Sequence, residues 1–148
     1  MPNVFIVIGD GGTRKSALVR ALTGASNRRI YDIEDSSSNK QQFFVQVRSL
    51  QEANISPQNF ILEMQSKNVS NILTTLRING VNGQQSGVDY IAAFRNAGWL
   101  IDGIAIMSAA TINGLPTNYT PITIPFINST ARAANEMASN IRQTWGWK

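Results

Sequence analysis

The fold is decided by the segment Val4-Phe5-Ile6-Val7-Ile8-Gly9-Asp10-Gly11-Gly12-Thr13-Arg14-Lys15-Ser16. Residues 4–8 form an unbroken run of β-branched and aromatic side chains, which is typical of a strand buried on both faces. A glycine-rich turn follows. Residues 15–23 then carry apolar side chains at helical spacing, and Gly24 suits the end of a helix. The segment therefore predicts a strand, a glycine loop and a helix in direct succession.

The same pattern continues along the rest of the chain. We expect further strands over residues 29–33, 43–47, 71–78 and 101–107, and a weaker edge strand over 120–126, where two prolines occur. Helices are expected over 57–67, 88–97 and 128–144. This alternation predicts one α/β domain spanning residues 1–148: a three-layer, doubly wound, mostly parallel sheet of five to six strands with helices on both faces. Ligands of such sheets bind at the carboxyl ends of the strands, here the loops that follow Ile8, Ile33, Val47, Ile78 and Met107.

Composition excludes several kinds of chemistry. The 148 residues include no cysteine and no histidine, which rules out disulfide scaffolds, catalysis by Cys or His, and ordinary zinc sites. The formal charge of +4 permits a nucleic acid partner but does not require one. The first residues read as a strand rather than a signal peptide, and no apolar run approaches the roughly 20 residues that span a bilayer. We therefore expect a cytoplasmic protein without membrane contact.

The glycine loop (residues 9–16, GDGGTRKS) resembles the Walker A loop, G-x-x-x-x-G-K-[ST], of the P-loop NTPase superfamily. It is also similar to the deviant Walker A loop of partition-type ATPases, although Asp10 stands where those proteins have a signature lysine. Arg14 replaces the last glycine of the pattern. The resemblance implies a single nucleotide-binding domain that takes ATP, or GTP, with Mg²⁺. It implies that Lys15 bridges the β- and γ-phosphates, that Ser16 binds the metal, and that the phosphates are held by Gly9, Asp10, Gly11, Gly12, Thr13, Arg14, Lys15 and Ser16.

Hydrolysis needs an acid beside the metal and a group that stabilises the transition state. Asp32 and Asp35 close the second predicted strand, so they are the best candidates to bind Mg²⁺ together with Ser16. Arg77, near the end of the fourth strand, either clamps phosphate or is a rim arginine, and Arg48 has the same ambiguity. The expected catalytic set is Lys15, Asp32 and Arg77. The loop over 80–87 is either a lid, with Gln84 or Gln85 orienting water, or a plain connection.

Three functions remain open at this point. The first is an ATPase or GTPase, that is, a nucleoside triphosphatase or phosphotransferase, with ATP favoured because no Asn-Lys-x-Asp motif occurs. The second, favoured by Arg14, is a degenerate P-loop domain without turnover that serves as an interaction or DNA-associated partner. The third is a Rossmann-type dinucleotide-binding domain, in which Gly9, Gly11 and Arg14 approximate G-x-G-x-x-G and Asp32 holds a ribose. A protein partner or a second copy of the chain completing the site is also open, and Trp145 and Trp147 are either core anchors or a docking point.

Overall fold

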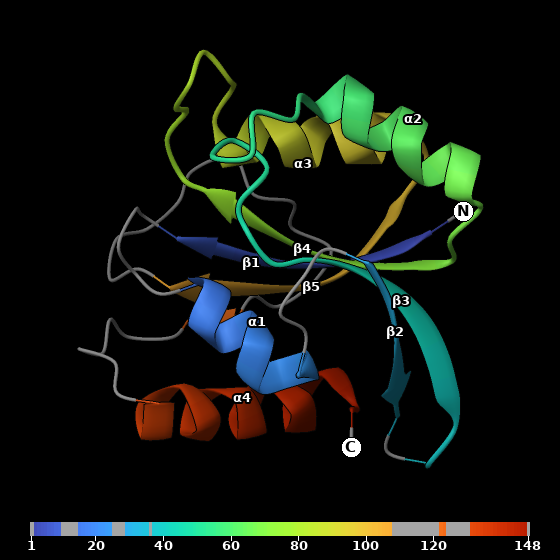
Figure 1. Ribbon diagram of the computed structural model, residues 1–148, viewed down its shortest axis with the longest axis vertical. Helices are drawn as coiled ribbons and strands as arrows, with labels where there is room; N and C mark the ends of the chain where they lie inside the picture. The colour runs from blue at the N-terminus through green and yellow to red at the C-terminus, as the bar shows by residue number, and fades with distance from the viewer. Residues whose placement is uncertain are drawn as a thin grey trace.

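The computed structural model describes residues 2–9, 15–24, 29–35, 37–107, 122–123 and 131–147. These residues form an α/β fold around a six-stranded sheet with the strand order β2-β3-β4-β1-β5-β6 (Figure 1). The strands are β1 (Asn3–Gly9), β2 (Arg29–Glu34), β3 (Lys40–Gln46), β4 (Asn71–Arg77), β5 (Leu100–Met107) and β6 (Ile122–Thr123). The helices are α1 (Lys15–Thr23), α2 (Pro57–Lys67), α3 (Gly87–Asn96) and α4 (Ala131–Trp145).

Most of the sheet is parallel. β1 lies at its centre and pairs in parallel with β4 on one side and with β5 on the other. β3 continues the parallel arrangement beyond β4, and β6 continues it beyond β5. The arrows of β1, β4 and β5 therefore point to the same end of the sheet, on the left in Figure 1, which we call the carboxyl edge. The opposite end is the amino edge. The prediction of an α/β protein with a mostly parallel sheet is confirmed.

β2 departs from this prediction because it runs antiparallel to β3. The two strands form a hairpin whose turn, residues 35–39, is far too short for the dozen or more residues that a parallel crossover needs. The end of β2 consequently points to the amino edge rather than to the carboxyl edge (Figure 1).

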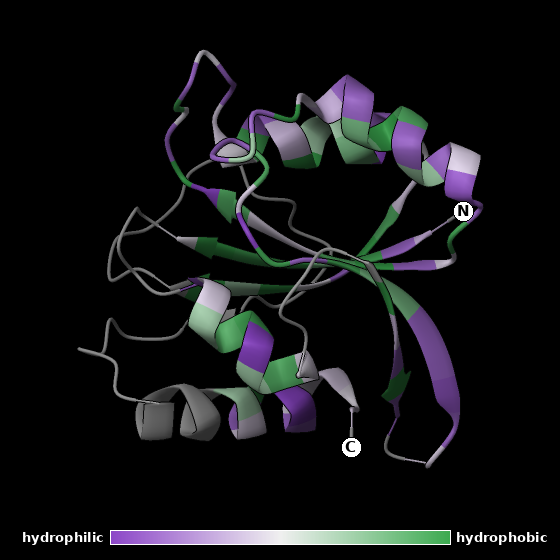
Figure 2. Ribbon diagram, viewed as in Figure 1, coloured by the Kyte–Doolittle hydropathy of each residue, from purple (hydrophilic) through white to green (hydrophobic). Residues whose placement is uncertain are grey.

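Alternate residues of β1 supply two hydrophobic clusters. Phe5 and Val7 contribute to the cluster on the side of α1 and α4, whereas Val4, Ile6 and Ile8 contribute to the cluster beneath α2 and α3. Figure 2 shows hydrophobic residues concentrated on the central strands, while the outer part of β3 is hydrophilic. The central strand is thus buried on both faces, as the unbroken apolar run of its sequence predicts.

Local signals set several helix boundaries. Ser56 caps α2, since its hydroxyl accepts a hydrogen bond of 3.2 Å from the Asn59 N–H, and Pro57 follows at the first helical position. Asn68 ends this helix in the left-handed conformation. The predicted edge strand 120–126 is described only at β6, and the residues before Ala131 in the last predicted helix lie outside the described part of the chain.

Candidate functional site

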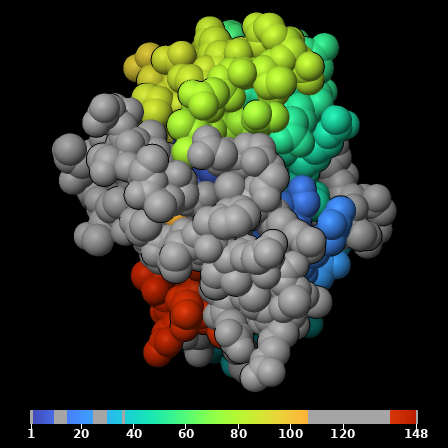
Figure 3. Space-filling view, turned by 90° about the vertical axis from the view of Figure 1, so that its left-hand side faces the viewer, coloured from blue at the N-terminus to red at the C-terminus, as the bar shows by residue number. Residues whose placement is uncertain are grey.

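Three strand ends and two helix beginnings meet at the carboxyl edge. Gly9, the last residue of β1, lies between Arg77 of β4 and Met107 of β5 in the sheet register. Its carbonyl accepts a hydrogen bond of 3.3 Å from the Ile78 N–H. Figure 3 looks onto this end of the molecule, where the segment before α3 lies against the turn that follows β3, close to α1. The first residue of the glycine loop is therefore fixed at the centre of the edge.

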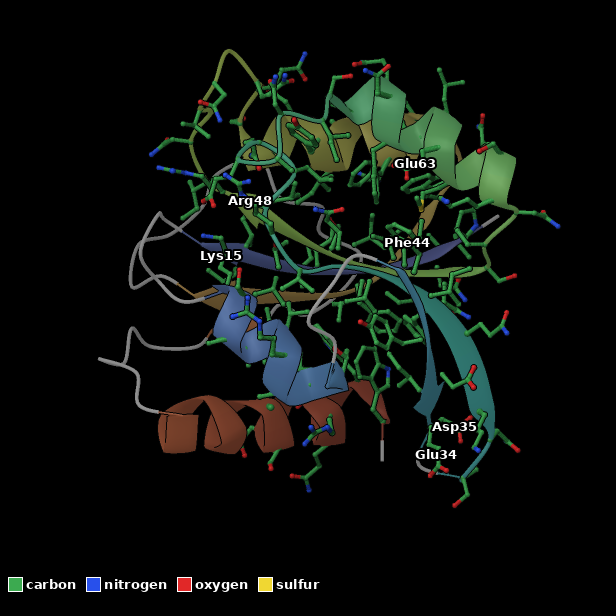
Figure 4. The ribbon with its side chains drawn as sticks, viewed as in Figure 1. Lys15, Glu34, Asp35, Phe44, Arg48 and Glu63 are labelled. Carbon is green, nitrogen blue, oxygen red and sulfur yellow. The ribbon has the colours of Figure 1, made fainter. Side chains whose placement is uncertain are left out.

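The beginning of α1 brings Lys15 and Ser16 to the same place. Lys15 is 5% exposed. The Ser16 hydroxyl donates a hydrogen bond of 3.2 Å to the Val47 carbonyl, and the hydroxyl of Thr75, from β4, donates one of the same length to that carbonyl. Figure 4 shows Lys15 and Arg48 at the same end of the sheet. The remaining loop residues Asp10, Gly11, Gly12, Thr13 and Arg14 lie outside the described residues.

Arg77 is held in position by a buried glutamine. β3 ends at Gln46, beside Thr74, so β4 has no strand partner on that side further along. The side-chain amide of Gln51 takes over: its Oε1 accepts from the Arg77 N–H at 3.0 Å, and its Nε2 donates to the Arg77 carbonyl at 2.9 Å. Gln51 is fully buried. This pair of hydrogen bonds fixes the backbone of Arg77 next to Gly9.

The side chain of Arg77 faces one acid. Its Nη1 lies 3.7 Å from Glu52 Oε1, with the two side chains 28% and 34% exposed. Such a pair, partly open to solvent, contributes weakly to stability, about 0–1 kcal/mol. The Nε of Arg77 is buried and has no hydrogen-bond partner among the described residues. A buried hydrogen-bond donor without an acceptor is costly. An oxygen atom of a bound anion can remove this cost by accepting a hydrogen bond from the Arg77 Nε.

The segment 80–87 is tied to the turn after β3. Gln84 Nε2 donates to Asn54 Oδ1 at 2.9 Å, and Gln51 Nε2 also approaches the Gln85 carbonyl at 3.4 Å. The Tyr90 hydroxyl, from α3, donates to the Ile55 carbonyl at 2.6 Å, and burial raises the pKa of Tyr90 to about 12. Both side-chain amides proposed to orient water are thus in a segment anchored by hydrogen bonds.

Asp32 and Asp35 do not lie at this edge, contrary to the prediction. Because β2 is antiparallel, its end carries them toward the amino edge, and β3 and β4 separate β2 from β1. Figure 4 shows Asp35 far from Lys15. Asp35 instead closes the hairpin, with its Oδ1 accepting from the Ser37 N–H at 2.9 Å and the Asn39 N–H at 3.0 Å. The hydrogen bond from the Asn39 backbone is the main cause that lowers the pKa of Asp35. A magnesium site shared by Ser16, Asp32 and Asp35 is therefore inconsistent with the topology.

Sequence reasoning missed Gln51 and Glu52. Both follow Val47, one of the strand ends at which ligands were expected, but only Arg48 in that loop was considered. The signal that could have led to them is the short connection over residues 35–39, which indicates that β2 and β3 form a hairpin. Because β2 ends at the opposite edge of the sheet, the acid at the carboxyl edge comes instead from the loop after Val47, and this acid is Glu52.

Comparison of the chain with protein-family models, with curated proteins and with solved structures finds no significant match. The likeness to P-loop proteins accordingly depends on the sequence of residues 9–16 alone. Within the described residues, no helix is both long and apolar enough to cross a membrane.

Proposed function

We propose that this chain binds the phosphates of a nucleoside triphosphate, ATP in preference to GTP, where β1 meets α1. The observation that carries the proposal is the position of Lys15, which is buried in the first turn of α1. The amino end of a helix carries partial positive charge, and the ammonium group of Lys15 adds to it, so this end of α1 attracts negative charge. Phosphate oxygens supply that charge, and Ser16 lies next to Lys15 at the same helix end.

The beginning of α3 adds to the positive potential of this edge. The Gly87 N–H donates to the Ile78 carbonyl at 3.1 Å. A Cβ atom at Gly87 would lie 2.5 Å from the Arg77 carbonyl oxygen and 2.6 Å from Ile8 Cδ1. Glycine therefore lets a second helix begin directly against the ends of β1 and β4, which supports an anion site between the two helices.

The order of the strands supports the same location. From the neighbouring strands β1 and β5 the chain continues to opposite sides of the sheet, toward β3 and toward β6. With α1 and α4 over one face and α2 and α3 over the other, we infer a three-layer, doubly wound arrangement (Figure 1). In such sheets the ligand crevice lies outside the strand ends where the direction changes, here beside Gly9.

In the proposed site Arg77 contacts the terminal phosphates. Its backbone is fixed beside Gly9, and within the part of the chain that the structure describes its buried Nε has no hydrogen-bond partner. Glu52 neutralises the guanidinium when no ligand is bound, and a phosphate group with more negative charge displaces it. We expect Arg77 to favour triphosphates over shorter nucleotides, because a longer phosphate chain brings more negative charge to the strand ends beside Gly9.

Magnesium fits the site in part. The Ser16 hydroxyl is a suitable single ligand, since Mg²⁺ commonly keeps several waters and takes its other ligands from phosphate oxygens. Asp32 and Asp35 do not fit, and the described residues contain no group of three His, Cys, Asp or Glu side chains able to hold a metal ion. When bound, the ion would neutralise phosphate charge.

A second candidate function is a nucleotide-binding domain without turnover. The positions of the acidic side chains among the described residues favour it. Glu52 pairs with Arg77, while Asp32 and Asp35 point away from the edge. A dinucleotide-binding role loses its support, because an acid on β2 cannot reach a ribose bound next to Gly9.

Equilibrium binding measurements test the proposal. Titrations of ATP, GTP, ADP and AMP should show affinity falling as phosphates are removed and falling again when EDTA is added. Absence of binding by ATP and GTP at millimolar concentration would refute the proposal. Phosphate release from bound ATP would establish an ATPase, whereas binding without release would establish the second candidate. Arg14→Gly adds a further test, because weaker binding shows that Arg14 contacts phosphate and tighter binding shows that it obstructs the loop.

A further inference from the structure

A cavity lies at the amino edge, at the opposite end of the sheet from Gly9. Its volume is about 230 Å³. The residues that line it include four aromatic side chains and two acidic ones: Phe5, Phe43, Trp145, Trp147, Asp35 and Asp102. No lysine or arginine is among the described residues that line it. The cavity therefore places aromatic rings close to negatively charged carboxylates.

The aromatic wall is built by the end of the chain folding back onto β1. The ring of Phe5 lies 5.0 Å from that of Trp145 and 5.2 Å from that of Trp147, measured between centroids. Gly103 makes this possible, since a Cβ atom there would lie 2.4 Å from Trp145 Nε1. The indoles are thus core anchors, and they also form one side of the cavity.

Asp102 is brought to the cavity by an irregularity in β5. Val4 pairs with Ile101 and Phe5 pairs with Gly103, so Asp102 is an extra residue without a partner on β1. Bulges of this kind redirect a side chain and are frequent beside binding sites. Among the described residues, no basic side chain pairs with Asp102, and partial burial raises the pKa of its carboxyl group. The Asp102 side chain is exposed, so its carboxylate is accessible to a cationic ligand from solvent.

We propose that this cavity binds a small organic cation through a guanidinium or primary ammonium group, with Asp102 as the ionic partner and the aromatic rings beneath it. Aromatic faces attract such cations, and they do so more strongly when water is excluded. The second acid, Asp35, stays ionised because backbone N–H groups hold its pKa low. The volume lies below the roughly 300–1,000 Å³ of pockets for drug-sized ligands, so it suits one cationic group on a short stem. This proposal does not depend on nucleotide binding.

Tryptophan fluorescence and calorimetry test the site with three probes of similar size: ethylguanidinium, ethylammonium and the neutral N-ethylurea. The two cations should bind and change the indole emission, and the urea should not. Asp102→Asn should weaken cation binding at least about tenfold through loss of the charge-assisted contact. The matched control Asp32→Asn, which removes an exposed acid of the β2–β3 hairpin that does not line the cavity, should leave binding unchanged.

Two results would overturn the proposal: N-ethylurea binding as well as ethylguanidinium, or equal cation affinities in Asp102→Asn and the wild type. The first comparison needs no variant, so it remains decisive if a variant fails to fold. We expect Asp102→Asn to fold with a Tm close to that of the wild type, because the side chain is exposed and pairs with no basic side chain among the described residues. An acetylated peptide with one arginine separates the sources of the cation. Tighter binding than ethylguanidinium identifies a polypeptide side chain, and weaker binding identifies a free small molecule.

Discussion

Replacing Gln51 with methionine tests whether the carboxyl edge depends on this buried amide. The side chain is fully buried, and its amide makes the hydrogen bonds of 3.0 and 2.9 Å that satisfy the N–H and the carbonyl of Arg77. Methionine has a similar volume, so it leaves little cavity but offers neither a donor nor a comparable acceptor. The variant therefore removes these two contacts, together with the longer one of 3.4 Å from Gln51 Nε2 to the Gln85 carbonyl, while nearly preserving the volume.

The expected cost follows from the groups left unsatisfied. A buried polar group without a partner costs about 1–3 kcal/mol. Because Arg77 is only partly buried, the lower half of this range applies to each of the two groups, which gives a total of about 2–4 kcal/mol. Against a typical free energy of unfolding of about 5–15 kcal/mol, this is a large loss.

Urea denaturation measures the effect. With a slope of about 2 kcal/mol/M, the midpoint should fall by about 1–2 M. Gln65→Met, an exposed position on α2, is the matched control and should change the free energy of unfolding by less than about 0.5 kcal/mol. Hydrogen exchange at the Arg77 amide should accelerate in Gln51→Met alone. A loss of stability no larger than that of the control would refute the structural role assigned to Gln51.

Three further predictions concern the surrounding packing and the hairpin. Gly87→Ala should destabilise the fold by about 1–3 kcal/mol in the same denaturation assay, because its Cβ would meet the Arg77 carbonyl and the Ile8 side chain; an unchanged midpoint would contradict this contact. Tyr90→Phe should cost about 1–2 kcal/mol, since it leaves the Ile55 carbonyl without its donor, and a neutral result would show that water replaces the hydroxyl. Asp35→Asn should be less stable than the wild type at pH 7. Its folded pKa is lowered from 3.8, so the contribution of Asp35 exists above that value and disappears as the pH falls below it, and the two midpoints should converge on acidification.

Local signals in the sequence predicted the helices well. Helices over 15–23 and 57–67 were expected with the bounds that the structure has, because apolar spacing, a serine cap and a following proline act within a few residues. The strands from Asn71 and toward Met107 were also expected within a residue or two. These features need no knowledge of distant contacts.

The direction of β2 could not be read from the same signals. Apolar patterning identifies a strand but does not give its orientation, and the short connection over residues 35–39 was the one indication of a hairpin. Because of this error, Asp32 and Asp35 were expected at the carboxyl edge of the sheet, whereas they lie toward the amino edge. The roles of Gln51 and Glu52 were missed for a related reason, since each depends on a contact with Arg77, 26 and 25 positions away in the chain.

The central claim, that Lys15 binds the phosphates of a nucleotide, is tested most directly by calorimetric titration of ATP with Mg²⁺ into three proteins: the wild type, Lys15→Ala and Lys40→Ala. Lys40 is exposed in the β2–β3 hairpin, away from the carboxyl edge, so its replacement removes the same charge without touching the site. We predict that the wild type and Lys40→Ala bind with similar affinity and that Lys15→Ala, still folded by circular dichroism, loses at least about 2 kcal/mol of binding free energy, roughly a thirtyfold weaker Kd. Equal ATP affinity in Lys15→Ala and the wild type would contradict the claim.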